Sequence, residues 1–438
     1  MTRTARQIGL VIAVSLVMGN MIGSGVFLLP ASLAPYGGVS FVGWIITAGG
    51  SLFLALVFAR LVRLNPAAGG PYAFTRQAFG SLAGFVVAWG YWVSCWATNA
   101  ALAVAFVGYL DPFAPELVRH PPTAALMAIA SLWVLTAVNA RGVHAAGSVQ
   151  TVTTVIKILP LLIVGFAGLA VFAPSHFAVS TSSMPALGQS VLAVIPLTLW
   201  AFLGLESATI PADSVHEPRR TIPRATIIGT AAAAVLYIVS TAGVMSAIPP
   251  GELADTSAPF AEAARVLFGD AAALFVAAGA AISCLGALNG WILITGQMPM
   301  AIARDGSFPS TFAVTSSRGT PVRGLLIGGG LSTAVIAANY TDNLVALFTF
   351  IVLLATLSVL IAYVSCSLAS FFLREPGGKR LTRGAAVTAG LAFLYSLVAV
   401  GGAGADAVFW GVILMVAGLP VYFWMRWRHR PSARRESV

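Results

Sequence analysis

The chain has 438 residues, of which 58% are hydrophobic and only 9% are charged, and its formal net charge is +10. Soluble domains carry about 25% charged residues, so this composition excludes a water-soluble protein and indicates an integral membrane protein. No zinc-protease motif, phosphate-binding loop or dinucleotide-binding turn is present, so the sequence does not support ATP-driven pumping or proteolysis.

Hydrophobic runs long enough to cross a bilayer, about 20 residues each, predict an all-α fold with twelve transmembrane helices. We place them at residues 8–35, 39–61, 82–109, 123–140, 147–173, 188–212, 225–248, 270–302, 322–339, 343–372, 385–403 and 407–425. Clusters of proline and glycine, such as the turn-forming stretch 65–71, separate the runs. We expect one transmembrane domain over residues 1–425, followed by a basic cytoplasmic tail at 426–438.

The basic residues predict how the chain is oriented. If both ends are cytoplasmic, all but three of the 24 lysine and arginine residues lie on the cytoplasmic side; the exceptions are Arg119, Arg265 and Lys157. This distribution follows the positive-inside rule. It predicts a multi-pass protein of the cell inner membrane. The positive charge then serves orientation and contact with anionic membrane lipid, and we expect no nucleic-acid partner.

The first span, residues 8–35, contains Gly19, Gly23 and Gly25, with Ser24 between the last two. Glycine costs a helix interior about 1 kcal/mol relative to alanine, and unwound backbone at membrane depth persists only where it is buried in protein or lines a cavity. Free N–H groups and a serine hydroxyl at a helix N-terminus suit a carboxylate. Close packing of helices through small residues is the alternative. We expect a break that forms half of a substrate site.

The sixth span, residues 188–212, repeats this pattern with Gly204 and Glu206 at mid-depth. Spans one and six are five apart and therefore enter the membrane from opposite faces, as in an inverted repeat. We predict a five-plus-five inverted repeat at about 8–173 and 188–372, with helices one and six discontinuous and two extra helices at about 385–425. Unwound carbonyls between Trp200 and Leu203 would accept hydrogen bonds from a substrate ammonium.

Two ionisable residues, Glu206 and Lys157, lie within predicted spans, where charged groups are costly and usually functional. For Glu206 we favour a pH-responsive gate or proton carrier, and a buried structural acceptor is the alternative. Lys157 lies about ten residues, roughly 15 Å, from the cytoplasmic start of its span. It could replace a coupling sodium ion, or reach cytoplasmic water through a crevice.

Spans three and eight carry further candidates for binding. Tyr91, Cys95 and Asn99 share one helical stripe, and Asn99 can accept from a substrate amine or guanidinium. Polar stripes also join helices to one another. Trp291 follows a glycine and could lay its ring against a cationic side chain, with ordinary packing as the alternative. The three cysteines have no metal-site spacing, and the five histidines lie in or near loops. We therefore expect neither an enzyme nor a metal site.

Five features together resemble the amino acid–polyamine–organocation transporters. They are the motifs GNMIGSGVFLLP at 19–30, AAGGPYAF at 67–74, YWVSCWATNA at 91–100 and LTLWAFLGLESA at 197–208, and Trp291. The chain is most similar to the arginine/agmatine antiporter group, with the putrescine/ornithine exchangers next. The resemblance implies a LeuT-like fold, transport of an amino acid or polyamine by alternating access, and no cofactor. It is also compatible with a homodimer.

The resemblance implies roles for the residues at matching positions. Ser24 and Gly25 would take the substrate carboxylate, Trp200 would cover the substrate and Trp291 would stack on a guanidinium. The implied substrate-binding residues are Met21, Ile22, Ser24, Gly25, Ser94, Cys95, Asn99, Trp200, Leu203, Trp291 and Ala355. The gating or coupling residues are Tyr91, Lys157, Trp200, Glu206 and Tyr363.

Two positions depart from the arginine/agmatine pattern. Ala355 stands where that group has a serine near the guanidinium, and Ser94 could compensate for the loss. Lys157 is not a feature of that group and resembles the span-five lysine of proton-linked and exchanger-type neutral amino acid permeases. The leading hypothesis is exchange of a cationic amino acid for a related amine, as arginine for agmatine. The alternative is proton-coupled uptake of neutral amino acids through Lys157.

Overall fold

The computed structural model of the chain describes residues 7–178, 184–340, 345–374 and 381–428. Over these residues the protein is a bundle of helices without β-strands, and one isolated bridge pairs Ile8 with Val215. The residues from 429 onward in the predicted basic tail lie outside the described part, as do Arg3, Arg6 and Lys379, which contributed to the predicted orientation.

Ten helical stretches of the described chain are long and apolar enough to cross a membrane. They are α3 (Val39–Leu64), α5 (Ser81–Gly108), α7 (Pro121–Ala140), α8 (Val143–Ala170), α10 (Pro218–Ala247), α13 (Asp270–Arg304), α14 (Val322–Asn339), α15 (Val345–Phe372), α16 (Arg383–Gly402), and α17 (Ala405–Ala417) joined to α18 (Leu419–Arg428). Each one coincides with a run predicted from hydropathy to within a few residues. The all-α membrane fold predicted from the sequence is therefore confirmed.

The two remaining predicted spans, residues 8–35 and 188–212, are interrupted. The first divides into α1 (Leu10–Met21) and α2 (Gly25–Leu33), whose axes differ by 43°. In the second, α9 (Met184–Trp200) ends at Trp200, and tight turns and the 3₁₀ segments η3 (Ser207–Thr209) and η4 (Ala212–Ser214) follow. We expected both breaks, but the second half of the sixth span does not return to an α-helix. Gly204 turns the chain there with φ +101°.

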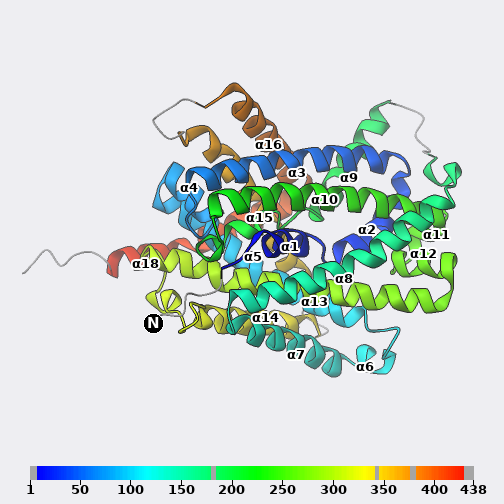
Figure 1. Cartoon of the computed structure of the whole chain (residues 1–438), viewed down its shortest axis with the longest axis horizontal. Helices are drawn as coiled ribbons and strands as arrows, with labels where there is room; N and C mark the ends of the chain where they lie inside the picture. Colours follow the sequence, from blue (N-terminus) through cyan, green and yellow to red (C-terminus); the bar gives the residue numbers. More distant parts are fainter. Residues whose placement is uncertain (1–6, 179–183, 341–344, 375–380, 429–438) are drawn as a thin grey trace, which may run out of the picture.

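Short elements connect the spans at the two ends of the bundle. They are η1 (Ala34–Tyr36), α4 (Pro71–Phe79), α6 (Pro115–Arg119), η2 (Pro174–Phe177), α11 (Pro250–Asp255), α12 (Pro259–Phe268) and η5 (Ser310–Ala313). Most of them begin with proline, whose fixed φ and missing N–H suit the first helical position. Figure 1 shows α6, α11 and α12 together at one end of the bundle, with α4 and α18 at the opposite end.

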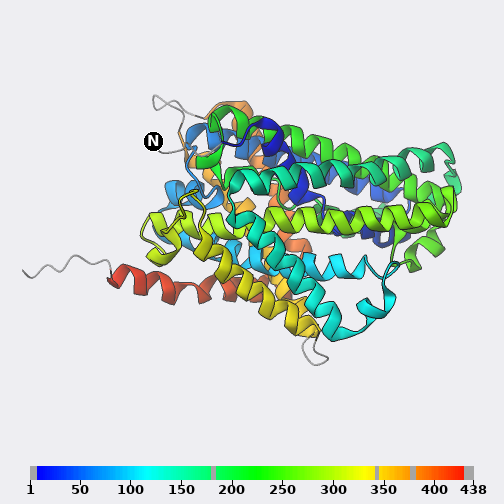
Figure 2. The same ribbon diagram turned by 60° about the horizontal axis from the view of Figure 1, so that its bottom comes forward.

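The interrupted helix α1 lies inside the bundle and packs against α8, α10 and α13 (Figure 1). In the turned view of Figure 2, the described chain starts at the same end of the bundle from which α18 projects, and the connection between α5 and α7 lies at the other end. Both termini of the described chain therefore lie on one side.

Glycines bring the C-terminal halves of α8 and α10 into backbone contact. A Cβ atom added to Gly243 would lie 2.2 Å from the carbonyl oxygen of Gly165, and one added to Gly168 would lie 2.1 Å from that of Gly243. Small residues allow such close approach of membrane helices. The close contact between α8 and α10 therefore depends on these three positions.

We expect Gly243→Ala to lower the melting temperature of the detergent-solubilised protein by several degrees, since overpacking a tight contact costs about 1–3 kcal/mol. The matched control is Gly330→Ala on α14, where an added Cβ meets no atom within 4 Å. Alanine is the better helix former, so the control should melt at the same temperature as the wild type or slightly above it. Equal melting temperatures for the two variants would contradict the close contact.

Candidate functional site

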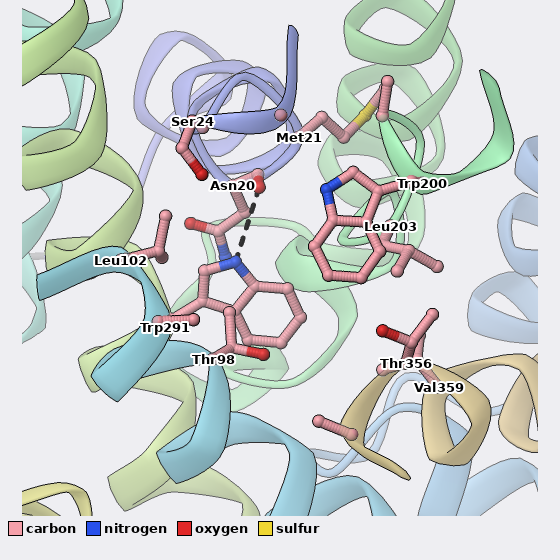
Figure 3. Close-up of a pocket in the computed structure, with 15 residues that line it drawn as sticks. Asn20, Met21, Ser24, Thr98, Leu102, Trp200, Leu203, Trp291, Thr356 and Val359 are labelled. Carbon is pink, nitrogen blue, oxygen red and sulfur yellow. Dashed lines mark hydrogen bonds between the residues drawn. The ribbon is translucent and has the colours of Figure 1, made fainter. Parts of the chain in front are cut away.

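A cavity of about 70 Å³ lies where the two interrupted spans face each other. Its walls come from the α1–α2 break, the chain after α9, and helices α5, α13 and α15 (Figure 3). The lining residues are Asn20, Met21, Gly23, Ser24, Gly25, Thr98, Ala101, Leu102, Trp200, Ala201, Leu203, Trp291, Ala355, Thr356 and Val359. No residue in this set carries a formal charge. A ligand would therefore meet peptide groups, hydroxyls and aromatic rings.

The break in the first span exposes peptide N–H groups to the cavity. The chain leaves the helix at Ile22, whose φ and ψ are −82° and 89°, and α2 starts again at Gly25. The first N–H groups of a helix have no acceptor within the helix. The side chain of Ser24 does not cap α2, and Figure 3 shows it beside the cavity. The N-terminus of α2 can therefore receive an anionic group.

Trp200, the last residue of α9, covers the start of α2. A Cβ atom at position 25 would lie 2.6 Å from both Cδ1 and Nε1 of the Trp200 indole, so only glycine leaves room for this ring. The side chain remains 39% exposed. Gly25 therefore has a steric reason to be glycine in addition to the helix break, and Trp200 narrows the cavity from one side.

A second indole, that of Trp291 on α13, lies across the cavity from Trp200 (Figure 3). Its Nε1 donates to the carbonyl oxygen of Asn20 at 3.4 Å. The Asn20 side chain in turn donates from Nδ2 to Ser207 Oγ at 2.8 Å. The two interrupted spans are thus joined directly by a side-chain hydrogen bond, and the Trp291 ring is held at the break.

Glu206, fully buried just after the turn at Gly204, joins three spans. Tyr91 on α5 donates its hydroxyl to Oε1 of the carboxylate, and Tyr363 on α15 donates to Oε2. The Gly204 N–H donates to the Tyr363 hydroxyl at 3.1 Å. Three of the five residues expected to gate or couple transport, Tyr91, Glu206 and Tyr363, therefore form one contact set. Their gating role stays a prediction.

Lys157 on α8 is also fully buried. Its ammonium contacts the break but does not line the cavity. Nζ donates to the carbonyl oxygens of Gly19 at 2.7 Å and Ile22 at 2.5 Å. In a continuous helix the Gly19 carbonyl would accept from the N–H of Gly23, but that N–H bonds to Met21 instead. The side chain does not reach water through a crevice. It supplies the donor that the unwound backbone lacks.

Seven of the predicted binding residues line the cavity: Met21, Ser24, Gly25, Trp200, Leu203, Trp291 and Ala355. The other four lie behind the lining. Ile22 holds Lys157 through its carbonyl, Ser94 Oγ donates to the Tyr91 carbonyl at 2.6 Å, Cys95 is buried, and Asn99 Nδ2 donates to Thr295 Oγ1 at 2.9 Å.

Several lining residues were not predicted, among them Thr98, Leu102, Thr356 and Val359. On α5, Thr98 and Leu102 follow the predicted residue Ser94 at four-residue spacing, and on α15 Val359 follows the predicted residue Ala355 in the same way. Helical spacing could therefore have located these three. The stripe Tyr91–Cys95–Asn99 pointed to a neighbouring face of α5 instead.

Comparison with known proteins agrees with this geometry. A family model described as amino acid permease matches residues 8–401. The chain belongs to this family. Two bacterial relatives are similar along most of their length. The cadaverine/lysine antiporter of Escherichia coli (strain K12) is 36% identical over 337 residues, 76% of this chain and 75% of the relative. The putrescine transporter PotE of Haemophilus influenzae is 32% identical over 429 residues, 96% of this chain and 98% of the relative.

Family membership confirms the resemblance found in the sequence motifs. The amino acid permease is a multi-pass membrane transporter and not an enzyme. The match ends within α16, so α17 and α18 lie beyond the matched part. Both interrupted spans and all cavity-lining residues lie inside it.

We expect Lys157→Met to weaken binding of the transported amino acid about fivefold or more: an unsatisfied buried carbonyl costs about 1–3 kcal/mol, so the break that forms the site shifts toward other conformations that do not bind. The melting temperature of the ligand-free protein should fall only slightly, since removing a desolvated ammonium offsets part of the cost of the unsatisfied carbonyl. Thermal shift with and without ligand measures both. Val155→Met on the same helix, at a position 58% exposed, is the control and should leave both values unchanged.

Proposed function

We propose that this permease is a secondary transporter that exchanges a cationic amino acid for a related amine by alternating access. The observation that carries the proposal is the pairing of two interrupted spans around an uncharged cavity. One span offers the N-terminus of a helix, and the other offers a helix C-terminus at Trp200. These ends carry opposite partial charges, and they suit the carboxylate and α-ammonium of a zwitterion.

The cationic end of the substrate would lie between the rings of Trp200 and Trp291. A cation over an indole face gains about 0.5–2 kcal/mol, the larger values applying to desolvated sites. The hydroxyls of Thr98 and Thr356 line the same cavity and add polar groups without fixed charge. Such a site tolerates both an amino acid and its decarboxylated amine, because the amine keeps the cationic end that the rings contact.

The relatives give this proposal its substrate class. The name of one relative gives a diamine and an amino acid, cadaverine and lysine, as its substrates, and the name of the other gives the diamine putrescine. We propose lysine with cadaverine, ornithine with putrescine or arginine with agmatine as the exchanged pair. Ala355 lines the cavity, and its lack of a hydroxyl makes the arginine/agmatine pair the least favoured of the three.

We further propose the topology that the sequence predicts: twelve spans, of which ten form a five-plus-five inverted repeat. The protein would lie in the cell inner membrane with both termini in the cytoplasm. The two ends of the described chain lie on one side of the bundle (Figure 2), as an even number of spans requires. Apolar side chains such as Ile45, Val134 and Val152 are exposed on the outside of the bundle, where they suit lipid. A dimer would leave this arrangement unchanged.

The alternative function is proton-coupled uptake of a neutral amino acid, and Lys157 is the observation that favours it. Its ammonium bonds two carbonyls of the break, so a change in its protonation would alter the hydrogen bonding of the substrate site. Exchange and proton coupling differ in what drives release from a vesicle.

We expect proteoliposomes loaded with radiolabelled lysine, ornithine or arginine to release label when the matching external amine is added, and to retain it in buffer alone. The binding site of an exchanger reorients across the membrane only with a ligand bound, whereas a proton-coupled carrier responds to an imposed pH gradient. Label efflux measures both. Release that ignores external amine but follows the pH gradient would overturn exchange and support the alternative function.

We expect Trp291→Leu to weaken binding of the cationic substrate by about 1–2 kcal/mol more than binding of leucine, because only the cation loses the contact with the ring face. The lost hydrogen bond to the Asn20 carbonyl affects both ligands equally and therefore cancels in the comparison. Competition against a radiolabelled ligand gives the two affinities. An equal loss for both ligands would mean that Trp291 packs against the break without contacting a cation.

A further inference from the structure

A second cavity lies next to the first, at the end of the bundle formed by α2, the last turn of α5, α12 and the start of α13. Its volume is about 350 Å³, against about 70 Å³ for the inner cavity. It is lined by Phe27, Leu28, Ala105, Gly108, Tyr109, Asp111, Pro112, Ser257, Ala258, Phe260, Ala261, Val276, Ala277 and Ala280. We call it the outer cavity, because its loops lie on the side predicted to face out of the cell.

The outer and inner cavities follow one another along shared walls. On α5, Leu102 lines the inner cavity and Ala105 the outer one, so one helical face continues from the first to the second. On α2, Gly25 lines the inner cavity and Leu28, three positions on, lines the outer one. Tyr109 lines the outer cavity and donates its hydroxyl to the Ser24 carbonyl at 3.4 Å. A ligand that reaches the inner site from this side passes through the outer cavity.

The opposite end of the bundle is tied together across both interrupted spans. The Ile8 N–H donates to the Ser214 carbonyl at 2.8 Å, and the His216 N–H donates to the Ile8 carbonyl at 2.9 Å. Arg304 forms an ion pair with Asp213 at 2.8 Å. These contacts join the start of span one, the end of span six and the end of α13. In this conformation the outer cavity is therefore the approach to the inner site.

The walls of the outer cavity have the chemistry of a site for an organic cation. The Phe27 ring packs edge-on against Tyr109, with centroids 6.1 Å apart, and against Phe260 at 5.3 Å. Aromatic faces attract ammonium groups. Asp111 is the one charged residue among the lining residues. Aromatic rings beside a single carboxylate match an alkylammonium.

The carboxylate of Asp111 is available to a ligand although it has a protein partner. Arg119 donates to its two oxygens at 3.1 and 3.2 Å, and each oxygen keeps a second lone pair. The Arg119 side chain is 73% exposed and that of Asp111 is 40% exposed, so water screens the pair and a ligand can reach the carboxylate. A ligand ammonium can therefore share or displace this contact.

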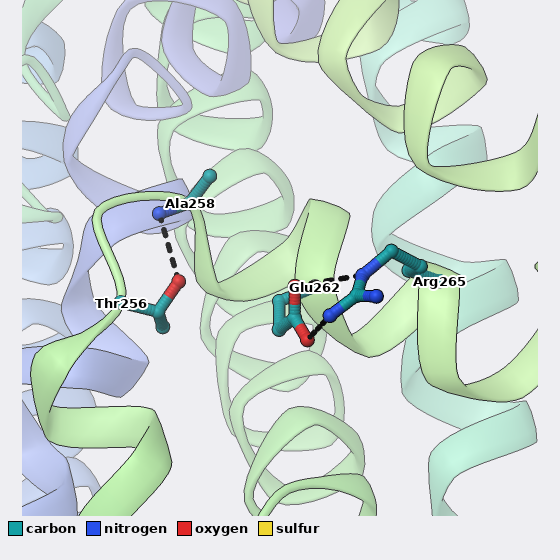
Figure 4. Close-up of polar contacts among 4 residues, drawn as sticks. All are labelled: Thr256, Ala258, Glu262 and Arg265. Carbon is teal, nitrogen blue, oxygen red and sulfur yellow. Dashed lines mark hydrogen bonds and ion pairs between the residues drawn. The ribbon is translucent and has the colours of Figure 1, made fainter. Parts of the chain in front are cut away.

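An acidic residue on α12, near this wall, is already engaged. Glu262 on α12 forms a two-bond ion pair with Arg265 one turn further along the helix, and it does not line the cavity (Figure 4). The turn that leads into α12 is held by the Ala258 N–H, which donates to Thr256 Oγ1 at 3.2 Å. This turn places Ser257 and Ala258 at the cavity wall.

We propose that the outer cavity is a second binding site, which holds the ammonium of an incoming amine between Asp111 and the rings of Phe27, Tyr109 and Phe260 before the amine enters the inner site. The assignment of the ligand rests on the proposed exchange function. The site would give the cation a first contact, with the aromatic faces and the Asp111 carboxylate, before it enters the uncharged inner cavity.

The test compares Asp111→Asn with Glu116→Gln, which removes a negative charge from the exposed helix α6 in the same connection. Proteoliposomes with one orientation are loaded with radiolabelled lysine or ornithine, and external cadaverine or putrescine is varied. We expect Asp111→Asn to raise the half-saturating concentration of external amine about threefold or more while the maximal rate stays within about twofold of wild type. Glu116→Gln should match wild type. Equal behaviour of the two variants would overturn the outer site.

A binding measurement separates this inference from the proposed exchange. Equilibrium binding of radiolabelled cadaverine to purified wild-type protein should show two sites per chain, and Asp111→Asn should remove or weaken one of them. Phe260→Leu should weaken the same one, and melting temperatures near that of the wild type would show that both variants fold. If the wild type binds two cadaverines but does not exchange, the exchange function fails and the outer site stands. If it exchanges but binds one, the outer site is wrong.

Discussion

Peptide groups that leave a helix inside a membrane have no water to bond to, and each unsatisfied group costs several kcal/mol. The α1–α2 break survives here because side chains from α8, α13 and the end of α5 supply donors to its carbonyls. The donor–acceptor pairs are Lys157 to Gly19 and Ile22, Trp291 to Asn20, Ser283 to Ile22 and Gly23, and Tyr109 to Ser24. The bundle around α1 is arranged so that these donors meet one short stretch of chain.

This arrangement divides the polar groups of the break between the protein and the substrate. The carbonyls are engaged by the protein, while Ser24 and Gly25 at the start of α2 line the cavity. The first N–H groups of a helix have no acceptor within the helix. A substrate carboxylate would therefore complete the hydrogen bonding of the break. Under the proposed function, binding energy and the stability of the break would be linked, because ligand and protein side chains would satisfy different groups of the same backbone segment.

Glycine allows this arrangement at close range. At Gly25 the absence of a Cβ admits the Trp200 ring, and at Gly290 it admits the amide of Asn20, whose Oδ1 would lie 1.8 Å from an added Cβ. Further along the bundle, Gly165 and Gly243 bring α8 against α10. Positions that look like helix breakers in the sequence therefore serve two purposes, one at the break itself and one in packing helices against it.

The sequence by itself determined the membrane fold, nearly all the spans and the two interrupted helices. These features depend on local properties: hydrophobic length, and glycines at mid-span beside Ser24 and Glu206. Its motifs also determined the family. Tertiary structure alone decided which side chains meet the break, because Lys157, Tyr109 and Ser283 are far from it in the chain. It also decided that Ser94, Cys95 and Asn99 lie behind the cavity while Thr98 lines it, since the rotation of α5 is set by packing against α13 and α15 and not by its own residue pattern.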